Sequence, residues 1–383
     1  MQLRHLTLLA AAKAVAAQAP TLAEVLAAQS ETLSSLTTWV QSQQAVYSLL
    51  AGAEDITILA PSNKAFEELA NSPLASQLTS DPNFLTAFLS YHVLNGTYYA
   101  SNLTSSPQLV LPTLLDLANY ENVTGPQKVI SRVSDGGVSF LSGGGSLSTV
   151  QTANVNYTGG TIHVIDSVLN LPANVTNTLL AANLTATLGA VRQAGVEDVL
   201  NTTPDLTVFV PTNDAFAAIG NLVSGLTAEQ LGGILGYHVI PGKVVYSSDI
   251  ADGSVATLEG SNLNIRVQDG NVFVNSAKVI AADILIANGV AHVIDGVLNP
   301  DNASAQPNPT ASTASPAFSG ASSTDGVPFT SGIAVPPAAT ASATSSGSSP
   351  VSTEPVAGGQ GKVAAIGAAA LFGAGAVALM NQL

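Results

Sequence analysis

Two kinds of hydrophobic spacing alternate along the middle of the chain. Residues 21–50 and 175–200 place apolar side chains three or four positions apart, which predicts amphipathic helices. Residues 206–210 form a short apolar run rich in β-branched side chains, and Pro211 follows them. We therefore predict a strand that ends at Pro211 and is followed by a further helix.

Sheet structure is predicted in the later part of the same region. Residues 263–267 alternate apolar with polar side chains, Asp269-Gly270 interrupts them, and residues 272–274 resume the alternation. An Asp-Gly dipeptide between two alternating runs is typical of a tight hairpin turn. Residues 291–294 are apolar on both faces, which predicts a buried strand. Helices followed by such strands indicate an α+β domain.

Four sequence blocks occur twice in the same order, which indicates an internal duplication. The blocks and their copies are 56–66 and 206–216, Tyr91-His92-Val93 and Tyr237-His238-Val239, 132–136 and 266–270, and 160–170 and 289–299. Each copy is about 130 to 150 residues long, which is enough for a domain with its own core. We therefore predict two tandem domains, at residues 18–172 and 173–300.

These blocks resemble the conserved blocks of the fasciclin (FAS1) domain family. The segments that carry the resemblance are 57–66 and 207–216, the two Tyr-His pairs, and 163–170 and 292–299. The resemblance implies two tandem α+β domains, each a wedge-shaped β-sandwich flanked by helices. It also implies a role in cell adhesion without catalysis.

The Tyr-His pairs are the candidate recognition residues. In the fasciclin family this region is implicated in receptor contact, so the resemblance implies adhesion contact at Tyr91, His92, Tyr237 and His238. Leucine and valine residues flank both pairs, which favours a core position in which each imidazole satisfies hydrogen bonds. We take the core position as the leading interpretation and adhesion contact as its alternative.

The other repeated histidines do not predict a catalytic or metal site. His163 and Asp166 lie three positions apart in a predicted strand, as do His292 and Asp295. An odd separation places the two side chains on opposite faces of a strand, so neither pair can act as an acid and base together. We therefore expect no metal and no cofactor.

Two further observations bear on chemistry. Asn63 and Asn213 each follow a predicted strand and are interpreted as helix caps rather than ligands. The chain contains no Gly-x-Ser-x-Gly, His-Glu-x-x-His or P-loop motif. A hydrolase is therefore only the third functional hypothesis, since paired carboxylates need not be close in sequence.

Composition excludes several classes of protein. Hydrophobic residues make up 46% of the 383 residues and charged residues only 9%, so uncharged polar groups or attached sugars must keep the surface hydrated. The formal charge of -15 disfavours nucleic acid, and the absence of cysteine excludes disulfides and Cys-ligated zinc. Eight Asn-x-Ser/Thr sequons are the predicted N-glycosylation sites: Asn95, Asn102, Asn122, Asn156, Asn174, Asn183, Asn201 and Asn302.

Both ends of the chain are interpreted as targeting segments. Residues 1–17 have a basic start, an apolar run and small residues before Gln18, which predicts a signal peptide, with an N-terminal helix as the alternative. Residues 301–362 are rich in Ser, Thr, Ala and Pro, which predicts a disordered, O-glycosylated stalk. Residues 363–383 are uncharged and lack a basic flank, which favours a glycosylphosphatidylinositol (GPI) signal over a retained transmembrane helix.

These features together resemble fungal GPI-anchored fasciclin-like surface proteins. The leading hypothesis is a non-enzymatic adhesion protein on the extracellular face of the plasma membrane or in the cell wall, with the vacuolar membrane as an alternative location. Its expected partners are cell-surface or cell-wall proteins or glycans, and the membrane itself through a lipid anchor. The second hypothesis is a structural protein that binds wall polysaccharide or lignin.

Overall fold

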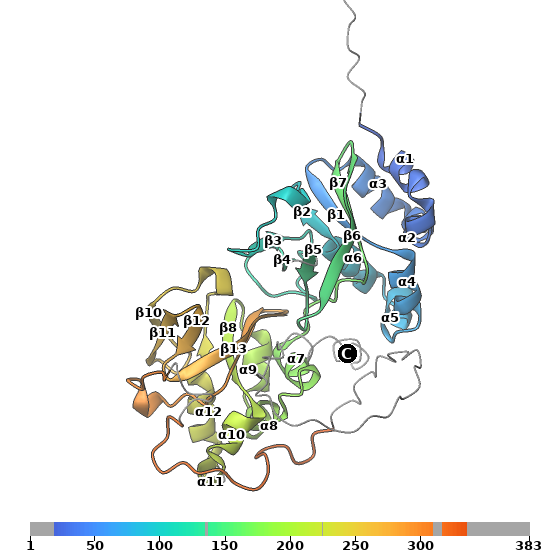
Figure 1. Cartoon of the computed structure of the whole chain (residues 1–383). Helices are drawn as coiled ribbons and strands as arrows, with labels where there is room; N and C mark the ends of the chain where they lie inside the picture. Colours follow the sequence, from blue (N-terminus) through green and yellow to red (C-terminus); the bar gives the residue numbers. More distant parts are fainter. Residues whose placement is uncertain (1–18, 135–136, 224, 309–315, 335–383) are drawn as a thin grey trace, which may run out of the picture.

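Two α+β domains follow each other in the described part of the chain (Figure 1). The computed structural model describes residues 19–134, 137–223, 225–308 and 316–334. The predicted signal peptide (1–17) and hydrophobic tail (363–383) lie outside these residues. Among the residues that the structure describes, no helix is long and apolar enough to cross a bilayer.

Helices begin each domain, which confirms the two regions of helical spacing. The helices of domain 1 are α1 (Leu22–Ala28), α2 (Ser30–Ser42), α3 (Gln44–Gly52), α4 (Asn63–Ala70), α5 (Leu74–Ser80) and α6 (Pro82–Tyr91). Those of domain 2 are α7 (Val175–Ala181), α8 (Thr185–Ala194), α9 (Glu197–Thr202), α10 (Asn213–Ala217), α11 (Gly220–Val223) and α12 (Ala228–Tyr237). Three 3-10 turns are η1 (Ala100–Asn102), η2 (Ser247–Asp249) and η3 (Pro300–Asn302).

Each domain has one seven-stranded sheet, in the order β2-β1-β7-β6-β5-β4-β3 or β10-β11-β12-β13-β14-β8-β9. The strands of domain 1 are β1 (Ile56–Pro61), β2 (Val93–Asn95), β3 (Leu109–Pro112), β4 (Lys128–Ser134), β5 (Gly137–Leu141), β6 (Leu147–Tyr157) and β7 (Gly160–Ile165). Those of domain 2 are β8 (Leu206–Pro211), β9 (Val239–Ile240), β10 (Gly253–Ala256), β11 (Asn262–Gln268), β12 (Asn271–Val274), β13 (Ala277–Ile286) and β14 (Gly289–Ile294).

The first and last long strands of each domain form a parallel pair beside the short edge strand, β2 or β9. β1 pairs with β7, and β8 pairs with β14. All residues of β8 and β14 are buried, because helices cover one face and the other half of the sheet covers the opposite face. The strand predicted to end at Pro211 and the buried strand predicted at residues 291–294 are thus confirmed.

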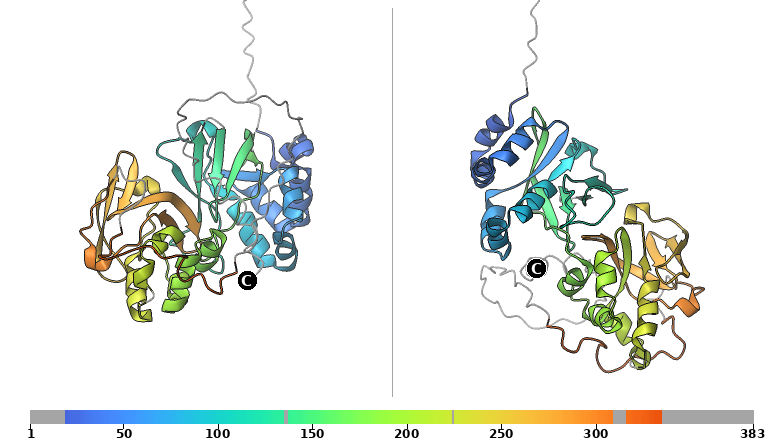
Figure 2. Two further views of the ribbon diagram at one scale, coloured as in Figure 1. Left: turned by 60° about the horizontal axis from the view of Figure 1, so that its bottom comes forward. Right: turned by 180° about the vertical axis from the view of Figure 1, so that it is seen from behind.

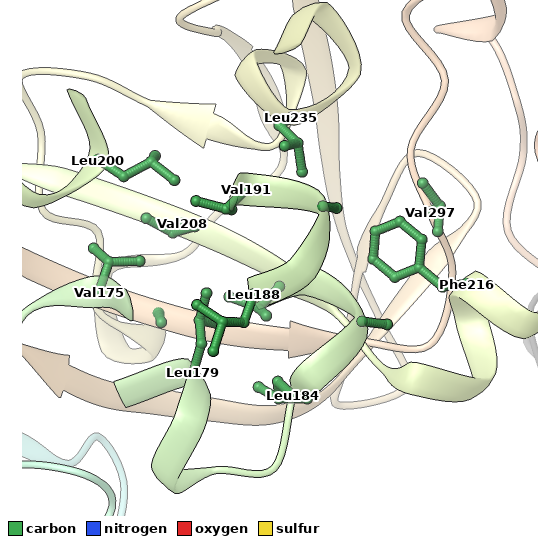
Figure 3. Packing of buried hydrophobic residues seen from close by; sticks show 14 of the residues in the cluster. Val175, Leu179, Leu184, Leu188, Val191, Leu200, Val208, Phe216, Leu235 and Val297 are labelled. Carbon is green, nitrogen blue, oxygen red and sulfur yellow. The ribbon is translucent and has the colours of Figure 1, made fainter. Parts of the chain in front are cut away.

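Successive residues of a strand in this parallel pair face two different hydrophobic cores. Val208 and Val210 of β8 pack against the helices of domain 2, whereas Phe209 points into the core between the two halves of the sheet. Figure 3 shows the first of these cores, in which Leu188 of α8 lies beside Val208. In domain 1, Ile58 and Leu59 divide between two cores in the same way.

One long strand in each domain bends the sheet back on itself. β6 pairs with β5 through its first part and with β7 through the rest, with two shifts of register. β13 does the same between β12 and β14. Asn154 and Asp283 lie in these irregular stretches at φ 59° and 66°. A bridge between Leu94 and Thr113 joins the two edges of the first sheet, so the predicted sandwich closes like a barrel.

The two domains contact each other through a loop of domain 1. Asn122 donates from its side-chain Nδ2 to the Thr202 carbonyl at 2.9 Å. Thr124 donates its N–H and its hydroxyl to the Asp205 carboxylate at 2.7 and 2.6 Å. An apolar cluster that includes Ile130 of domain 1 and residues of β13 and β14 lies beside these bonds. The interface therefore combines directional hydrogen bonds with hydrophobic contact.

Residues 316–334, which we call the C-terminal strap, lie against the helices of domain 2 (Figures 1 and 2). Phe318, Val327 and Phe329 contact the hydrophobic core there. This contact involves part of the predicted stalk at residues 301–362, for which composition alone indicated no packing against a domain. The average composition of the segment conceals a few large apolar side chains that are enough to hold it. Residues 335–362 of the predicted stalk lie outside the described residues.

Glycine is required where each last strand begins. A Cβ added to Gly289 would lie 1.8 Å from the Leu206 carbonyl oxygen of the neighbouring strand, and φ there is 150°. Gly160 has the same geometry in domain 1. Gly270 lies in the predicted hairpin turn between β11 and β12, which is confirmed, and also has a positive φ, of 74°. A Cβ at Gly270 would meet open space.

We expect Gly289→Ala to lower the free energy of unfolding by at least about 2 kcal/mol, because it adds a steric clash inside the parallel pair of β8 and β14 to the strain of a positive φ. The matched control is Gly270→Ala, which adds the strain alone and should cost about 1 kcal/mol. Urea unfolding of the two variants measures the difference. Equal losses would contradict the steric role of Gly289.

Candidate functional site

The Tyr-His pairs lie at the ends of two equivalent helices. Tyr91 is the last residue of α6 and His92 is its C-cap, and Tyr237 and His238 hold the same positions in α12. All four side chains are buried. The apolar flanks of the pairs account for this, because a helix that ends against the sheet must bury its last turn.

Both ring nitrogens of His92 are occupied. Nδ1 donates to the carbonyl of Phe88, one turn earlier, at 2.7 Å, and Nε2 accepts the N–H of Leu169 at 2.9 Å. His238 repeats these bonds with Ile234 and Leu298 at the same distances. Each imidazole is therefore neutral and joins the helix end to the segment that follows the last strand.

Burial determines the charge state of the two imidazoles. It lowers the pKa of His92 and of His238 from 6.5 to about 4, although a carbonyl acceptor opposes the shift in each case. At neutral pH both rings are therefore uncharged, and the one N–H of each ring is bonded to a backbone carbonyl.

The tyrosines connect the same helix ends to the other half of the sheet. The Tyr91 hydroxyl donates to the Lys128 carbonyl of β4 at 2.9 Å, and the Tyr237 hydroxyl donates to the Asn262 carbonyl of β11 at 2.9 Å. Asn275 in turn donates to the Tyr237 hydroxyl at 2.9 Å. Each pair thus joins three elements of its domain. Adhesion contact at these residues stays a prediction. Because the four side chains are buried, a partner would contact the residues around them and not the side chains themselves.

The second set of histidines makes a different buried connection. His163 donates from Nε2 to the Tyr98 carbonyl at 2.7 Å and accepts the Asn154 N–H at Nδ1. His292 repeats this with the Val245 carbonyl and the Asp283 N–H. Burial lowers the pKa of both rings. Each histidine therefore holds the irregular stretch of the long strand, β6 or β13, against the loop that follows β2 or β9.

Neither histidine pairs with the aspartate three residues later. Asp166 accepts the N–H of Thr149 at 2.7 Å, and Asp295 accepts that of Lys278 at 2.7 Å. The two aspartates thus connect the end of the last strand to the neighbouring long strand. In the structure, neither of these aspartates therefore acts on the histidine three residues before it.

Domain 2 places a serine, an aspartate and a histidine close together, which the sequence spacing did not reveal. The Ser247 N–H and hydroxyl both donate to the Asp283 carboxylate, and the backbone N–H of Asp283 donates to His292. The serine therefore bonds to the aspartate, and His292 is oriented away from it by the Val245 carbonyl. This order provides no general base for the hydroxyl. No three metal-binding side chains cluster in the described residues.

Asn63 and Asn213 cap helices other than the ones that directly follow them. Ser62 and Thr212 are the N-caps of α4 and α10, and each asparagine is the residue after the cap. The Asn213 side chain accepts the N–H of Ala186 at the start of α8, at 2.9 Å. Asn63 accepts an N–H of α2 in the same way, at 2.9 Å. These residues cap helices distant in sequence, which local spacing cannot show.

The predicted glycosylation sites differ in their surroundings. The side chains of Asn95, Asn102, Asn156 and Asn183 are exposed. The other four contact the protein: Asn122 bonds across the domain interface, Asn174 caps α7, Asn201 bonds to Thr176, and Asn302 bonds to Ala317. Glycosylation of all eight stays a prediction, and the first four offer the freest access.

A hollow of about 510 Å³ lies where the two domains meet. Its lining includes Asp81, Asn119, Tyr120, Asn177 and Ala287. The Tyr120 hydroxyl donates to the Asp81 carboxylate at 3.0 Å, which holds both side chains in place. The hollow therefore offers an aromatic ring beside a carboxylate and amide groups. Sequence spacing could not predict it, because its residues come from distant segments.

A family model described as the fasciclin domain matches the chain twice, at residues 31–172 and 182–300. A fasciclin-like arabinogalactan protein of Arthroderma benhamiae is 36% identical over 306 residues, which cover 79% of this chain and 72% of the relative. Another, of Cercospora beticola, is 34% identical over 254 residues, which cover 64% of this chain and 67% of the relative.

More distant similarity extends to animal proteins. Human periostin is 28% identical over 265 residues, which cover 66% of this chain and 29% of periostin. A solved FAS1 domain pair from the insect cell adhesion molecule Fasciclin I matches 71% of this chain and 98% of its own chain, at 23% identity and a TM-score of 0.35.

We expect His238→Ala to lower the free energy of unfolding by about 1 to 3 kcal/mol at pH 7, because the Ile234 carbonyl and the Leu298 N–H lose their partner. Wild type loses stability as the pH falls from 6.5 towards about 4, since the unfolded imidazole binds a proton that the buried one excludes. His238→Ala lacks this titration. The difference in the free energy of unfolding between wild type and variant should therefore become smaller by about 1 kcal/mol for each pH unit below 6.5.

Urea unfolding at several pH values between 7 and 4.5 measures this effect, and His92→Ala is the matching test in domain 1. A variant that is as stable as wild type at pH 7 but no longer binds cells or wall material would instead place His238 in a recognition surface.

Proposed function

Because the chain belongs to the fasciclin domain family, we propose that it is a non-enzymatic cell-surface adhesion protein that presents two fasciclin domains on a glycosylated stalk. The observation that carries the proposal is the joined pair of domains. Two copies of one fold, linked by hydrogen bonds and apolar contact, display their surfaces at a fixed spacing. Two weak sites held together in this way gain avidity without any new contact.

The buried chemistry of the domains supports a role without catalysis. In the described residues, both ring nitrogens of all four domain histidines bond to backbone groups. A histidine used in this way has no nitrogen left to activate a nucleophile. The four domain histidines therefore give the hydrolase hypothesis no support.

A second candidate function is binding of wall polysaccharide or lignin, and the hollow between the domains favours it. The ring of Tyr120 offers an apolar face, and Asp81 with Asn119 and Asn177 offers hydrogen-bonding groups. A sugar has apolar faces and a rim of hydroxyls, so it suits such a lining. This function is compatible with adhesion to a wall and differs from adhesion to a protein receptor.

We expect cells that lack the protein to detach in a flow cell at lower shear than cells that carry it.

Tyr120→Ala should weaken retention of the purified protein on glucan, chitin or lignin if the hollow binds them. Tyr99→Ala, an exposed tyrosine outside the hollow, is the matched control. Unchanged cell attachment together with retention on one of these polymers would replace the adhesion proposal by the second candidate.

We also propose that the chain is secreted and held by a C-terminal lipid anchor at the extracellular face of the plasma membrane or in the wall. Residues 363–383 carry no charge, and a long segment rich in small residues precedes them, which supports a GPI signal over a retained span. The vacuolar membrane is the alternative destination.

Deletion of residues 363–383 should send the protein into the medium, because the chain then lacks its attachment signal. Phosphatidylinositol-specific phospholipase should release the full-length protein from intact cells, and immunoblots of cells and medium measure both effects. A truncated form that stays on the cells, together with a full-length form that resists the enzyme, would refute the lipid anchor.

A further inference from the structure

The C-terminal strap is held to domain 2 by side-chain amides. Asn221 donates from Nδ2 to the Gly320 carbonyl at 3.0 Å and accepts the Ser322 N–H at 2.8 Å. Asn302 donates to the Ala317 carbonyl at 2.9 Å. These bonds fix the first part of the strap against η3 and α11.

Phe329 is the apolar anchor of the strap. Its ring meets that of Phe216 edge-on, with 5.7 Å between the ring centroids and 90° between the planes. Figure 3 shows Phe216 at one end of the helical core, beside Val297. Phe329 adopts a φ of 64°, which a bulky residue rarely does. The surrounding contacts therefore hold it in one particular conformation.

Two glycines allow the strap to approach the helices closely. A Cβ at Gly189 of α8 would lie 1.8 Å from the Phe329 carbonyl oxygen, and its three nearest heavy atoms all belong to that residue. A Cβ at Gly220 would lie 2.0 Å from a strap hydroxyl. With Phe216 and Asn221 these glycines form what we call the strap groove. Its shape is complementary to the strap, which follows an irregular path with several turns.

Domain 1 shows what fills the same place without a strap. If α2 and α8 are aligned at the N–H groups that bond to Asn63 and Asn213, Trp39 of α2 corresponds to Ala190 of α8. Trp39 meets Phe66, the domain 1 counterpart of the groove phenylalanine, edge-on at 5.5 Å. Domain 1 thus supplies its own aromatic ring, whereas domain 2 has small residues and takes the ring from the strap.

We propose that the strap groove is a binding site for an irregular, turn-containing segment with a phenylalanine, and that it accepts the strap of a second copy of this chain in place of its own. In the described residues the strap pairs with no strand of the sheet. The strap of another copy can therefore make the same contacts with the helices without any change in the sheet. Its only charged residue is Asp325, which adds little repulsion between copies. Exchange of an identical element between chains costs little.

This site gives the proposed adhesion protein a defined partner, a second copy, and rests on the proposed function only for its setting on a cell surface. Its test is made in solution with full-length protein. Failure of cell adhesion would therefore leave the result of this test unaffected.

Two full-length variants separate the groove from the strap. Gly189→Ala closes the groove and leaves the strap intact, and alanine favours the helix over glycine, so the domain should still fold. Phe329→Ala leaves the groove open and removes the anchor. Gly220→Ala is a second way to close the groove, and circular dichroism checks the fold of each variant.

A labelled peptide of residues 316–334 should bind the Phe329→Ala chain roughly ten-fold more tightly than wild type, whose own strap competes, and should not bind the Gly189→Ala chain. The same peptide with Phe329→Ala should bind neither. Failure to bind the open groove would overturn the binding site.

Mixed in equal amounts, the two variants should sediment as a one-to-one dimer in analytical ultracentrifugation, because one supplies the groove and the other the strap. Each variant alone should remain monomeric. A mixture that stays monomeric at a concentration where the peptide saturates the open groove would overturn exchange between copies.

Discussion

Each domain depends on a parallel pair of strands that comes from the two ends of its own sequence. β1 with β7, and β8 with β14, are buried on both faces, so one face requires a layer of helices and the other requires the second half of the sheet. The long bent strand follows from the same constraint, since one sheet must supply both the parallel pair and its cover. Gly160 and Gly289 are required because the paired backbones approach closely where the last strand begins.

The buried polar groups follow from this architecture. When helices cover one side of a closed sheet, backbone groups at the helix ends and at the strand bends cannot hydrogen-bond to water. A buried polar group without a hydrogen-bond partner lowers the stability of the fold. Imidazole, phenol and amide side chains provide these partners at equivalent places in both domains. Repetition of such groups after duplication therefore reflects the needs of the fold, which is sufficient to explain why the histidines recur.

Periodic features of the sequence predicted the fold well. The helical regions, the hairpin at Asp269-Gly270 and the buried last strand each depend on local spacing or on one dipeptide, and the structure confirms them. The targets of Asn63 and Asn213 could not be predicted, because each side chain caps a helix distant in sequence. The strap was missed since single phenylalanines in a Ser/Thr-rich segment leave its average composition unchanged. The hollow between the domains combines segments that only the tertiary structure brings together.

The strap also determines how a mechanical load would enter the molecule. A pull on the chain beyond residue 334 acts first on the contacts of the strap and only afterwards on β14. The strap contacts lie in sequence along the pulling direction, so they break one at a time, whereas the parallel pair of β8 and β14 would be loaded across many bonds together. Detachment of residues 316–334 would release roughly 60 Å of extended chain. The strap would thus serve as an extensible buffer that spares the folded domain from sudden tension.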